Sequence, residues 1–172
     1  ENGLATLVRI PPPYDNWDKI YTFPYGVVLH DLDISPDGHL LSGSVALDNG
    51  DHRMRVWELA KILKGDIKPI SEYSFGQSVP ESFVFSHDAR YLYGSSYYTG
   101  VSNIYRYEVT TGAVEAVSNA ETGFFRPVPL ADGRMVVLDY SGQGFVPATI
   151  EPRPIQDVSA ISFLGTELVE KY

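Results

Sequence analysis

A short turn recurs three times in this chain, and its spacing limits the folds that the chain can adopt. The turns are Ser35-Pro36-Asp37-Gly38, Ser86-His87-Asp88-Ala89 and Leu130-Ala131-Asp132-Gly133. Each follows one β-prone run and precedes another, and their aspartates stand 51 and 44 residues apart. Periods of about 40 to 50 residues with four short strands each are typical of propeller blades. We therefore predict an all-β fold, a β-propeller segment of four-stranded antiparallel blades.

The clearest copy of the unit lies between Glu81 and Gly112. Ser82–Ser86 alternates small and aromatic residues, the turn interrupts the run, and Arg90–Gly94 begins a second strand. Ile104–Val109 alternates again, and Thr111-Gly112 leads into a fourth run. Period-two alternation bounded by turn residues indicates strands, so this stretch predicts four strands in series.

We predict one β-propeller domain or fragment over residues 1–172. The expected blades are 1–26 (partial), 27–76, 77–120, 121–157 and 158–172 (partial). The outer pair of the first blade is expected at Ala5–Ile10 and Lys19–Phe23, and an inner pair at Val158–Leu164 and Leu168–Tyr172. Joined, the two pairs would close a ring of four blades, but the phenylalanines at 83, 85 and 125 would crowd its axis. We expect an open arc of a larger propeller, whose edge strands would drive self-association unless further blades cover them.

Three local patterns lead to finer predictions. The segment Ala60–Lys64 is too short for an independent helix, and we interpret it as a bulged strand end before Gly65. Prolines are frequent in the third copy, at 127, 129, 147, 152 and 154, so some of its segments should lie at sheet edges or pair irregularly. In the run Val27–Ser35, we expect Leu32 and Ile34 on one face and two aspartates on the other.

Composition excludes several classes of protein. With 13 basic and 22 acidic residues the net charge is −9, which argues against a nucleic-acid partner. Cysteine is absent, so the chain has no disulfide, thiol nucleophile or cysteine-based metal site. Apolar runs are shorter than a membrane span, and the first residues lack the layout of a signal peptide, so we expect any targeting segment to be missing or removed.

Two segments resemble a known family. Ile34-Ser35-Pro36-Asp37-Gly38-His39-Leu40-Leu41 resembles the Ser-Pro-Asp-Gly hairpin of TolB-like propellers, and Ile104–Gly112 resembles their third strand with its closing Thr-Gly. The likeness covers most of residues 30–145, although the second copy has His-Asp-Ala in place of Pro-Asp-Gly. Such propellers occur in TolB, in serine peptidases of the prolyl-oligopeptidase type and in bacterial envelope proteins. The resemblance implies a periplasmic or envelope-associated location, with the cytoplasm as the alternative.

Motifs for catalysis or cofactor binding are lacking. No Gly-x-Ser-x-Gly elbow occurs, and Gly142-Gln143-Gly144 alone predicts a loop. The four histidines, at 30, 39, 52 and 87, have no ordered metal spacing. Asp48-Asn49-Gly50-Asp51 is rich in oxygen ligands but lacks the later Glu of a calcium loop, so we interpret it as a solvated loop. We predict no catalytic, cofactor or metal site, and we expect the three turn aspartates to bond turn amides.

Exposed loop aromatics are typical anchors of protein interfaces, and Tyr97-Tyr98 lies in a loop where burial is not required. Loops that join the second and third strands of each blade emerge on one rim. That rim is predicted to hold Asp48, Asn49, Asp51, His52, Tyr97, Tyr98 and Gln143. We predict a non-catalytic module for protein interaction or scaffolding in a larger envelope protein.

Two alternatives remain open. One is an accessory propeller of a prolyl-oligopeptidase-like serine peptidase whose catalytic domain lies elsewhere. The other is a propeller enzyme that uses charged channel residues such as Asp31 and Asp33.

Overall fold

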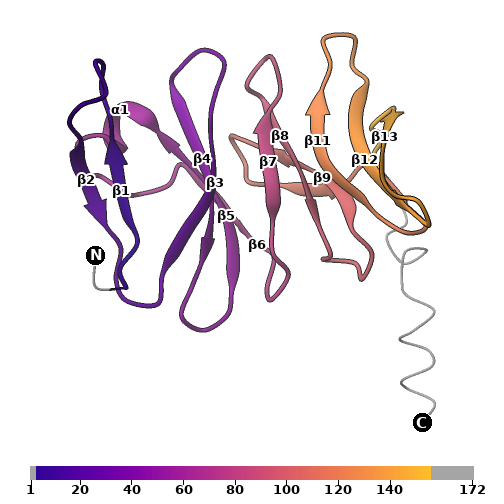
Figure 1. The fold of residues 1–172 in the computed structure, drawn as a ribbon, viewed down its shortest axis with the longest axis horizontal. Coiled ribbons are helices and arrows are strands. Elements are labelled where there is room, and N and C mark those ends of the chain that lie inside the picture. Colours follow the sequence, from indigo (N-terminus) through magenta and orange to yellow (C-terminus); the bar gives the residue numbers. More distant parts are fainter. Residues whose placement is uncertain (1–2, 156–172) are drawn as a thin grey trace.

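The computed structural model describes residues 3–155, which form four antiparallel sheets standing side by side (Figure 1). The first sheet contains β1 (Thr6–Arg9) and β2 (Asp18–Thr22). The second contains β3 (Val28–Ile34), β4 (Leu40–Ala46), β5 (His52–Glu58) and β6 (Ser71–Ser74). The third contains β7 (Glu81–Phe85), β8 (Tyr91–Ser96), β9 (Asn103–Glu108) and β10 (Val114–Ala116). The fourth contains β11 (Phe124–Pro129), β12 (Met135–Ser141) and β13 (Gly144–Ile150).

The strands of each sheet follow one another in chain order, as in the blades of a propeller. The prediction of an all-β propeller segment is therefore confirmed. Its helix content is one turn, α1 (Leu59–Ile62), among the described residues. Within residues 3–155, no helix has the length and apolar character needed to cross a membrane.

The prediction of a bulged strand end at Ala60–Lys64 is wrong, because α1 occupies this place. Ile62 is fully buried in a cluster with Trp57, and Lys61 pairs with Glu58 at 2.9 Å. The helix is stabilised by this tertiary burial, which the propensity of an isolated turn does not include.

The repeat extends to the backbone conformation of the innermost strands. Asp31, Ser82 and Arg126 stand at the same spacing as the turn aspartates, and all three have positive φ, at 50°, 54° and 48°. The pairing register of β3, β7 and β11 shifts at these positions. A β-bulge of this kind increases twist and re-aims side chains. Each of the three sheets thus has a bulge in its innermost strand, a feature that composition alone does not indicate.

The turn aspartates bond main-chain amides, as the sequence predicts. Asp37, Asp88 and Asp132 accept hydrogen bonds from the amides two residues later, at 3.0, 3.1 and 3.1 Å. Ser35 and Ser86 also donate to the aspartates of their turns. These hydroxyls hold the pKa of Asp37 and Asp88 below the usual value, and Arg134 does the same for the pKa of Asp132.

The second and third sheets pack through a buried core in which half of the side chains are aromatic. Phe75 of the second sheet contacts Phe83 and Tyr105 of the third, with ring centroids 5.7 and 5.9 Å apart in edge-to-face geometry. Tyr107 donates to the Ser71 hydroxyl at 2.8 Å, so its polar tip is satisfied inside the interface. Burial raises the pKa of Tyr107 to about 12. Contacts between aromatic rings of adjacent sheets thus stabilise the packing of one small sheet on the next.

The prolines of the fourth sheet lie on its edge strands. Pro127 and Pro129 belong to β11 and Pro147 to β13, whereas the central strand β12 contains none. Because proline cannot donate to a ladder, this placement agrees with the prediction.

The sheets follow the chain from one end of the molecule to the other (Figure 1). The first sheet, drawn in indigo, and the fourth, drawn in orange, lie at opposite ends, so the described residues form an open row. The strands expected at Val158–Leu164 and Leu168–Tyr172 lie outside the described residues.

Candidate functional site

The inner strands run in the same direction, which brings equivalent loops to one edge. The Asp31 and Asp33 carboxylates accept hydrogen bonds from the Ser82 and Phe85 amides at 2.9 and 2.8 Å. Asp31 bonds Ser82, and the later residue Asp33 bonds the later residue Phe85. The strands β3 and β7 therefore run parallel to each other. The loops Leu47–Asp51, Tyr97–Ser102 and Ser141–Gly144 therefore lie together on the edge that is lowest in Figure 1, called here the lower edge.

These two aspartates clamp one sheet to the next. We expected β3 to have Leu32 and Ile34 on one face and the two aspartates on the other. The bulge at Asp31 interrupts this regular alternation. Each carboxylate on β3 accepts a hydrogen bond from a main-chain amide of β7 in the next sheet. That amide is not used in the hydrogen-bond ladder between β7 and β8. This arrangement gives both residues a structural role and offers no support for catalysis by charged channel residues.

The polar loop on the lower edge is hydrogen-bonded both within itself and to the strands β5 and β6. The Asn49 side chain accepts from the Asp51 amide at 2.9 Å. The Asp51 carboxylate receives the Ser74 hydroxyl at 2.5 Å and the Arg53 guanidinium at 2.7 Å. Ser74 and Arg53 hold the pKa of Asp51 below its usual value. Asp51 is thus committed to the β5–β6 pairing, while Asp48 remains exposed.

The remaining polar members of the predicted rim are His52 and Gln143. His52 is the first residue of β5, and its Nδ1 atom is buried without a hydrogen-bond partner. Gln143 is exposed at the tip of the β12–β13 turn, where its main-chain N–H donates to the Ser141 hydroxyl at 3.2 Å. Among residues 3–155, no cluster of three or more acidic or histidine side chains has the arrangement of a metal site.

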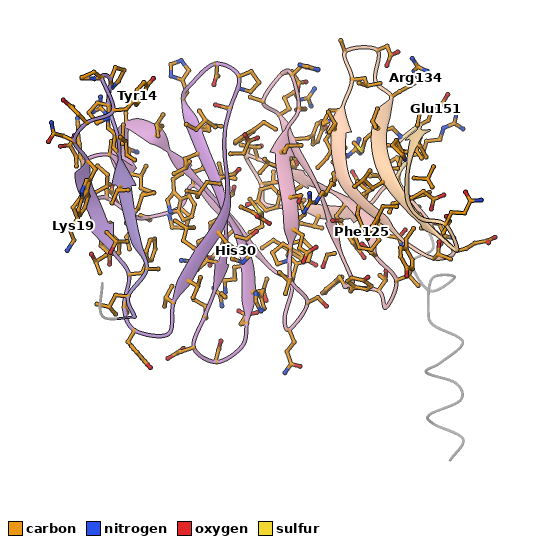
Figure 2. The ribbon with its side chains drawn as sticks, in the orientation of Figure 1. Tyr14, Lys19, His30, Phe125, Arg134 and Glu151 are labelled. Atoms are coloured by element: carbon orange, nitrogen blue, oxygen red, sulfur yellow. The ribbon has the colours of Figure 1, made fainter. Side chains whose placement is uncertain are left out.

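A row of aromatic side chains crosses the lower edge between the third and fourth sheets. Tyr97, 53% exposed, contacts the Phe125 ring at 5.9 Å between centroids. Phe125 contacts Phe145 at 5.3 Å, and Phe145 contacts Tyr140 at 5.2 Å. Figure 2 places Phe125 toward this edge and Arg134 at the opposite one. We name these four residues, Tyr97, Phe125, Phe145 and Tyr140, the aromatic row.

Tyr98 differs from its neighbour because it belongs partly to the core. Its ring packs edge-to-face on Tyr73, Phe75 and Tyr105, with centroids 5.7 to 6.2 Å apart. Its hydroxyl lies 3.4 Å from that of Tyr73. Burial, together with Tyr98, raises the pKa of Tyr73 to about 12. Tyr98 is 47% exposed and Tyr97 53%, so both tyrosines reach the surface, and Tyr98 alone also contacts the core ring of Phe75.

Sequence reasoning missed three members of the aromatic row. Phe125, Tyr140 and Phe145 come from β11, β12 and β13 and meet only through pairing within the fourth sheet. The available signal was the position of Phe145 directly after the Gly144 turn, at the same loop edge as Gln143.

Comparison with known proteins identifies the fold. No protein-family model and no curated protein matches the sequence. Among solved structures, TolB from Acinetobacter baumannii is 18% identical with a TM-score of 0.59, over 81% of this chain and 34% of that one. A puromycin-hydrolyzing peptidase from Mycobacterium tuberculosis is 16% identical with a TM-score of 0.59, over 79% of this chain and 22% of that one. An oligogalacturonate lyase in complex with manganese is 14% identical with a TM-score of 0.62, over 84% of this chain and 40% of that one.

These likenesses show a TolB-like β-propeller fold. The chain spans between 22% and 40% of the length of these three proteins. They include enzymes as well as TolB, so the fold does not by itself decide between catalysis and binding.

Proposed function

We propose that this chain is a non-catalytic propeller module that binds a protein partner through its lower edge. The aromatic row is the observation that carries the proposal. Aromatic side chains with large exposed faces at a loop edge are typical interface anchors, because they bury much apolar area at little cost in side-chain entropy. Tyr97 and Phe145 are both more than half exposed, and they are fixed by ring contacts on Phe125.

The charge of the edge supports a partner segment that is neutral or basic. The loops 23–27, 47–51, 75–80, 97–102, 117–123 and 141–144 contain no lysine or arginine. Asp48 and Glu121 in these loops are exposed, whereas the Asp51 carboxylate is already paired with Arg53. A partner with basic residues around an apolar centre would complement this edge, and such complementarity favours association rate and specificity.

Site-specific photo-crosslinking tests this proposal. A photo-reactive residue at Gln143, beside the aromatic row, should trap a partner that mass spectrometry identifies. The same group at Arg134 is the matched control on the opposite edge. With the purified partner, Tyr97→Ser should weaken binding at least about tenfold, as for an interface anchor. Trapping from Arg134 alone, or equal binding by Tyr97→Ser, would contradict the proposal.

Stability measurements separate binding from folding. Tyr97→Ser should leave the melting temperature nearly unchanged, whereas Tyr98→Ser should lower it because Tyr98 contacts the core ring of Phe75. Turnover of small esters or glycosides by the purified chain would refute the non-catalytic part of the proposal.

A second candidate is the accessory propeller of a serine peptidase, which the likeness to the puromycin-hydrolyzing peptidase favours. The sequence of the whole polypeptide separates the two. A downstream Gly-x-Ser-x-Gly domain would favour the peptidase, and a downstream series of alternating strands of about 10 residues would favour a bacterial envelope protein. On the resemblance to TolB, we propose a periplasmic or envelope-associated location rather than a cytoplasmic one.

A further inference from the structure

The aromatic row presents inclined rings at the lower edge. Adjacent ring centroids are 5.2 to 5.9 Å apart, and the planes of adjacent rings are inclined by 53° to 88°. Tyr97, Tyr140 and Phe145 are 53%, 48% and 57% exposed. Because neighbouring rings are inclined, their exposed faces meet at an angle, against which a small rigid ring such as that of proline can pack. Aromatic surfaces are used in this way by modules that bind proline-rich segments.

The spacing of the rings is compatible with a polyproline II helix. This helix has three residues per turn and rises about 3.1 Å per residue, so equivalent side chains recur about every 9 Å. Alternate rings of the row can be no farther apart than twice the separation of neighbouring rings. Prolines from successive turns of the helix can therefore pack on alternate rings.

A tyrosine hydroxyl stands at each end of the row. The buried tyrosines Tyr105 and Tyr107 have hydroxyls that are hydrogen-bonded inside the protein. Within residues 3–155, the hydroxyls of Tyr97 and Tyr140 have no such partner. A polyproline II backbone makes no internal hydrogen bonds, and proline has no N–H, so such a segment offers carbonyl acceptors and few donors. Hydroxyl donors beside apolar ring faces are the complement of that segment.

A carboxylate lies beside one end of the row. The Thr122 hydroxyl donates to the Tyr140 carbonyl, which holds the loop before β11 against this end. Glu121 in that loop is exposed, and it forms no ion pair within the described part of the chain. Arg126, by contrast, directly follows Phe125 and is closer to the centre of the row. A basic side chain of a ligand is therefore expected at the Tyr140 end.

We propose that the aromatic row binds a proline-rich segment of the partner in the polyproline II conformation, with a flanking arginine or lysine paired to Glu121. This inference rests on the proposed function, because it names the kind of segment that occupies the same edge. The prolines pack on the ring faces, and Tyr97 and Tyr140 donate to backbone carbonyls of the segment. A preformed polyproline II helix loses little conformational entropy on binding, which favours its recognition by fixed rings.

Fluorescence anisotropy of a labelled peptide with the full chain tests the inference. The peptide is a run of prolines with an arginine at each end, about nine residues long, which gives three turns of the helix. We expect it to bind at least about tenfold more tightly than the same peptide with alanine in place of proline. A version with glutamate in place of arginine should bind about threefold more weakly, as for loss of an exposed ion pair.

Substitutions locate the binding on the row. Tyr97→Ser should weaken binding of the proline peptide at least about tenfold, whereas Tyr97→Phe, which keeps the ring, should weaken it about three- to tenfold. Glu121→Gln should remove the difference between the arginine and glutamate peptides. Tyr14→Ser is the matched control, because Tyr14 is 72% exposed and lies at the opposite edge (Figure 2). It should leave binding unchanged.

Three results would overturn the inference. The first is a proline peptide that binds no more tightly than the alanine peptide at concentrations up to about 1 mM. The second is equal weakening by Tyr14→Ser and Tyr97→Ser. The third is a dimer in light scattering that Tyr97→Ser abolishes, because a second copy of the chain would then cover the row.

Photo-crosslinking from Gln143 distinguishes failure of this inference from failure of the proposed function. If a protein partner is trapped there but the proline peptide does not bind, this inference fails and the proposed function stands. If no partner is trapped and no peptide binds, both fail.

Discussion

Replacing Gly94 by alanine tests how tightly the core between the second and third sheets is packed. Gly94 lies in the middle of β8, and a Cβ atom added there would stand 2.0 Å from Cδ2 of Phe83 and 2.3 Å from its Cγ. Real Cβ contacts are practically never shorter than 3.0 Å, so the ring would have to move by about 1 Å. Phe83 is 1% exposed and packs edge-to-face on Phe75, which leaves it no free direction.

The expected cost is at the upper end of the range for overpacking. Extra methylene-sized groups in a packed core cost about 1 to 3 kcal/mol, and Gly→Ala at an unstrained site stabilises by about 0.4 to 1 kcal/mol through the unfolded state. With a contact as short as this one, we expect Gly94→Ala to lower the free energy of unfolding by about 3 kcal/mol. For a chain of this size, that corresponds to a fall in Tm of about 6 to 12 °C.

Gly43 is the matched control, because it holds the same repeat position in β4, 51 residues earlier. Its added Cβ would meet the side-chain ends of Leu32 and Leu29 at 2.8 and 2.9 Å. Leu32 borders an apolar cleft between the first and second sheets and has room to turn away, so Gly43→Ala should cost less than about 1 kcal/mol. Gly142→Ala, with nothing within 4 Å, should be nearly neutral.

Urea unfolding followed by far-ultraviolet circular dichroism measures all three variants. The slope m should not change, since the surface exposed on unfolding is the same. In a Phe83→Ala background, Gly94→Ala should cost little, because the atoms that it meets are gone. If Gly94→Ala costs no more than Gly43→Ala, the packing argument is refuted.

Two further predictions concern carboxylates. Asp33→Ala removes the acceptor of the Phe85 amide, which leaves a donor unpaired at the sheet interface, and should cost about 1 to 3 kcal/mol in urea unfolding; an unchanged midpoint would count against the clamp between sheets. Because Ser74 and Arg53 lower the pKa of folded Asp51 below 3.8, its contribution is fully present above that pH and is lost as the pH falls through the folded value. The Tm of the unaltered chain should therefore fall more steeply below about pH 4 than that of Asp51→Asn, and parallel pH profiles would contradict the pairing.

Much of the fold follows from the sequence because its signals are local. Strand alternation and the turn aspartates act over a few residues, and the turn spacing repeats them along the chain. These patterns therefore predicted the sheets, the turns and the edge positions of Pro129 and Pro147. The loop position of Tyr97 likewise predicted an exposed aromatic residue at the lower edge.

Contacts between sheets were decided only by the tertiary structure. Residues such as Tyr98, Phe125 and Phe145 acquire their roles from rings that are distant in sequence, and α1 is stabilised by burial of Ile62. Leu32 and Phe83 occupy one position in the repeat, yet one is half exposed and the other is buried. A repeat determines the conformation of each unit, whereas burial depends on which unit stands beside it, and that neighbour is specified only by packing in three dimensions.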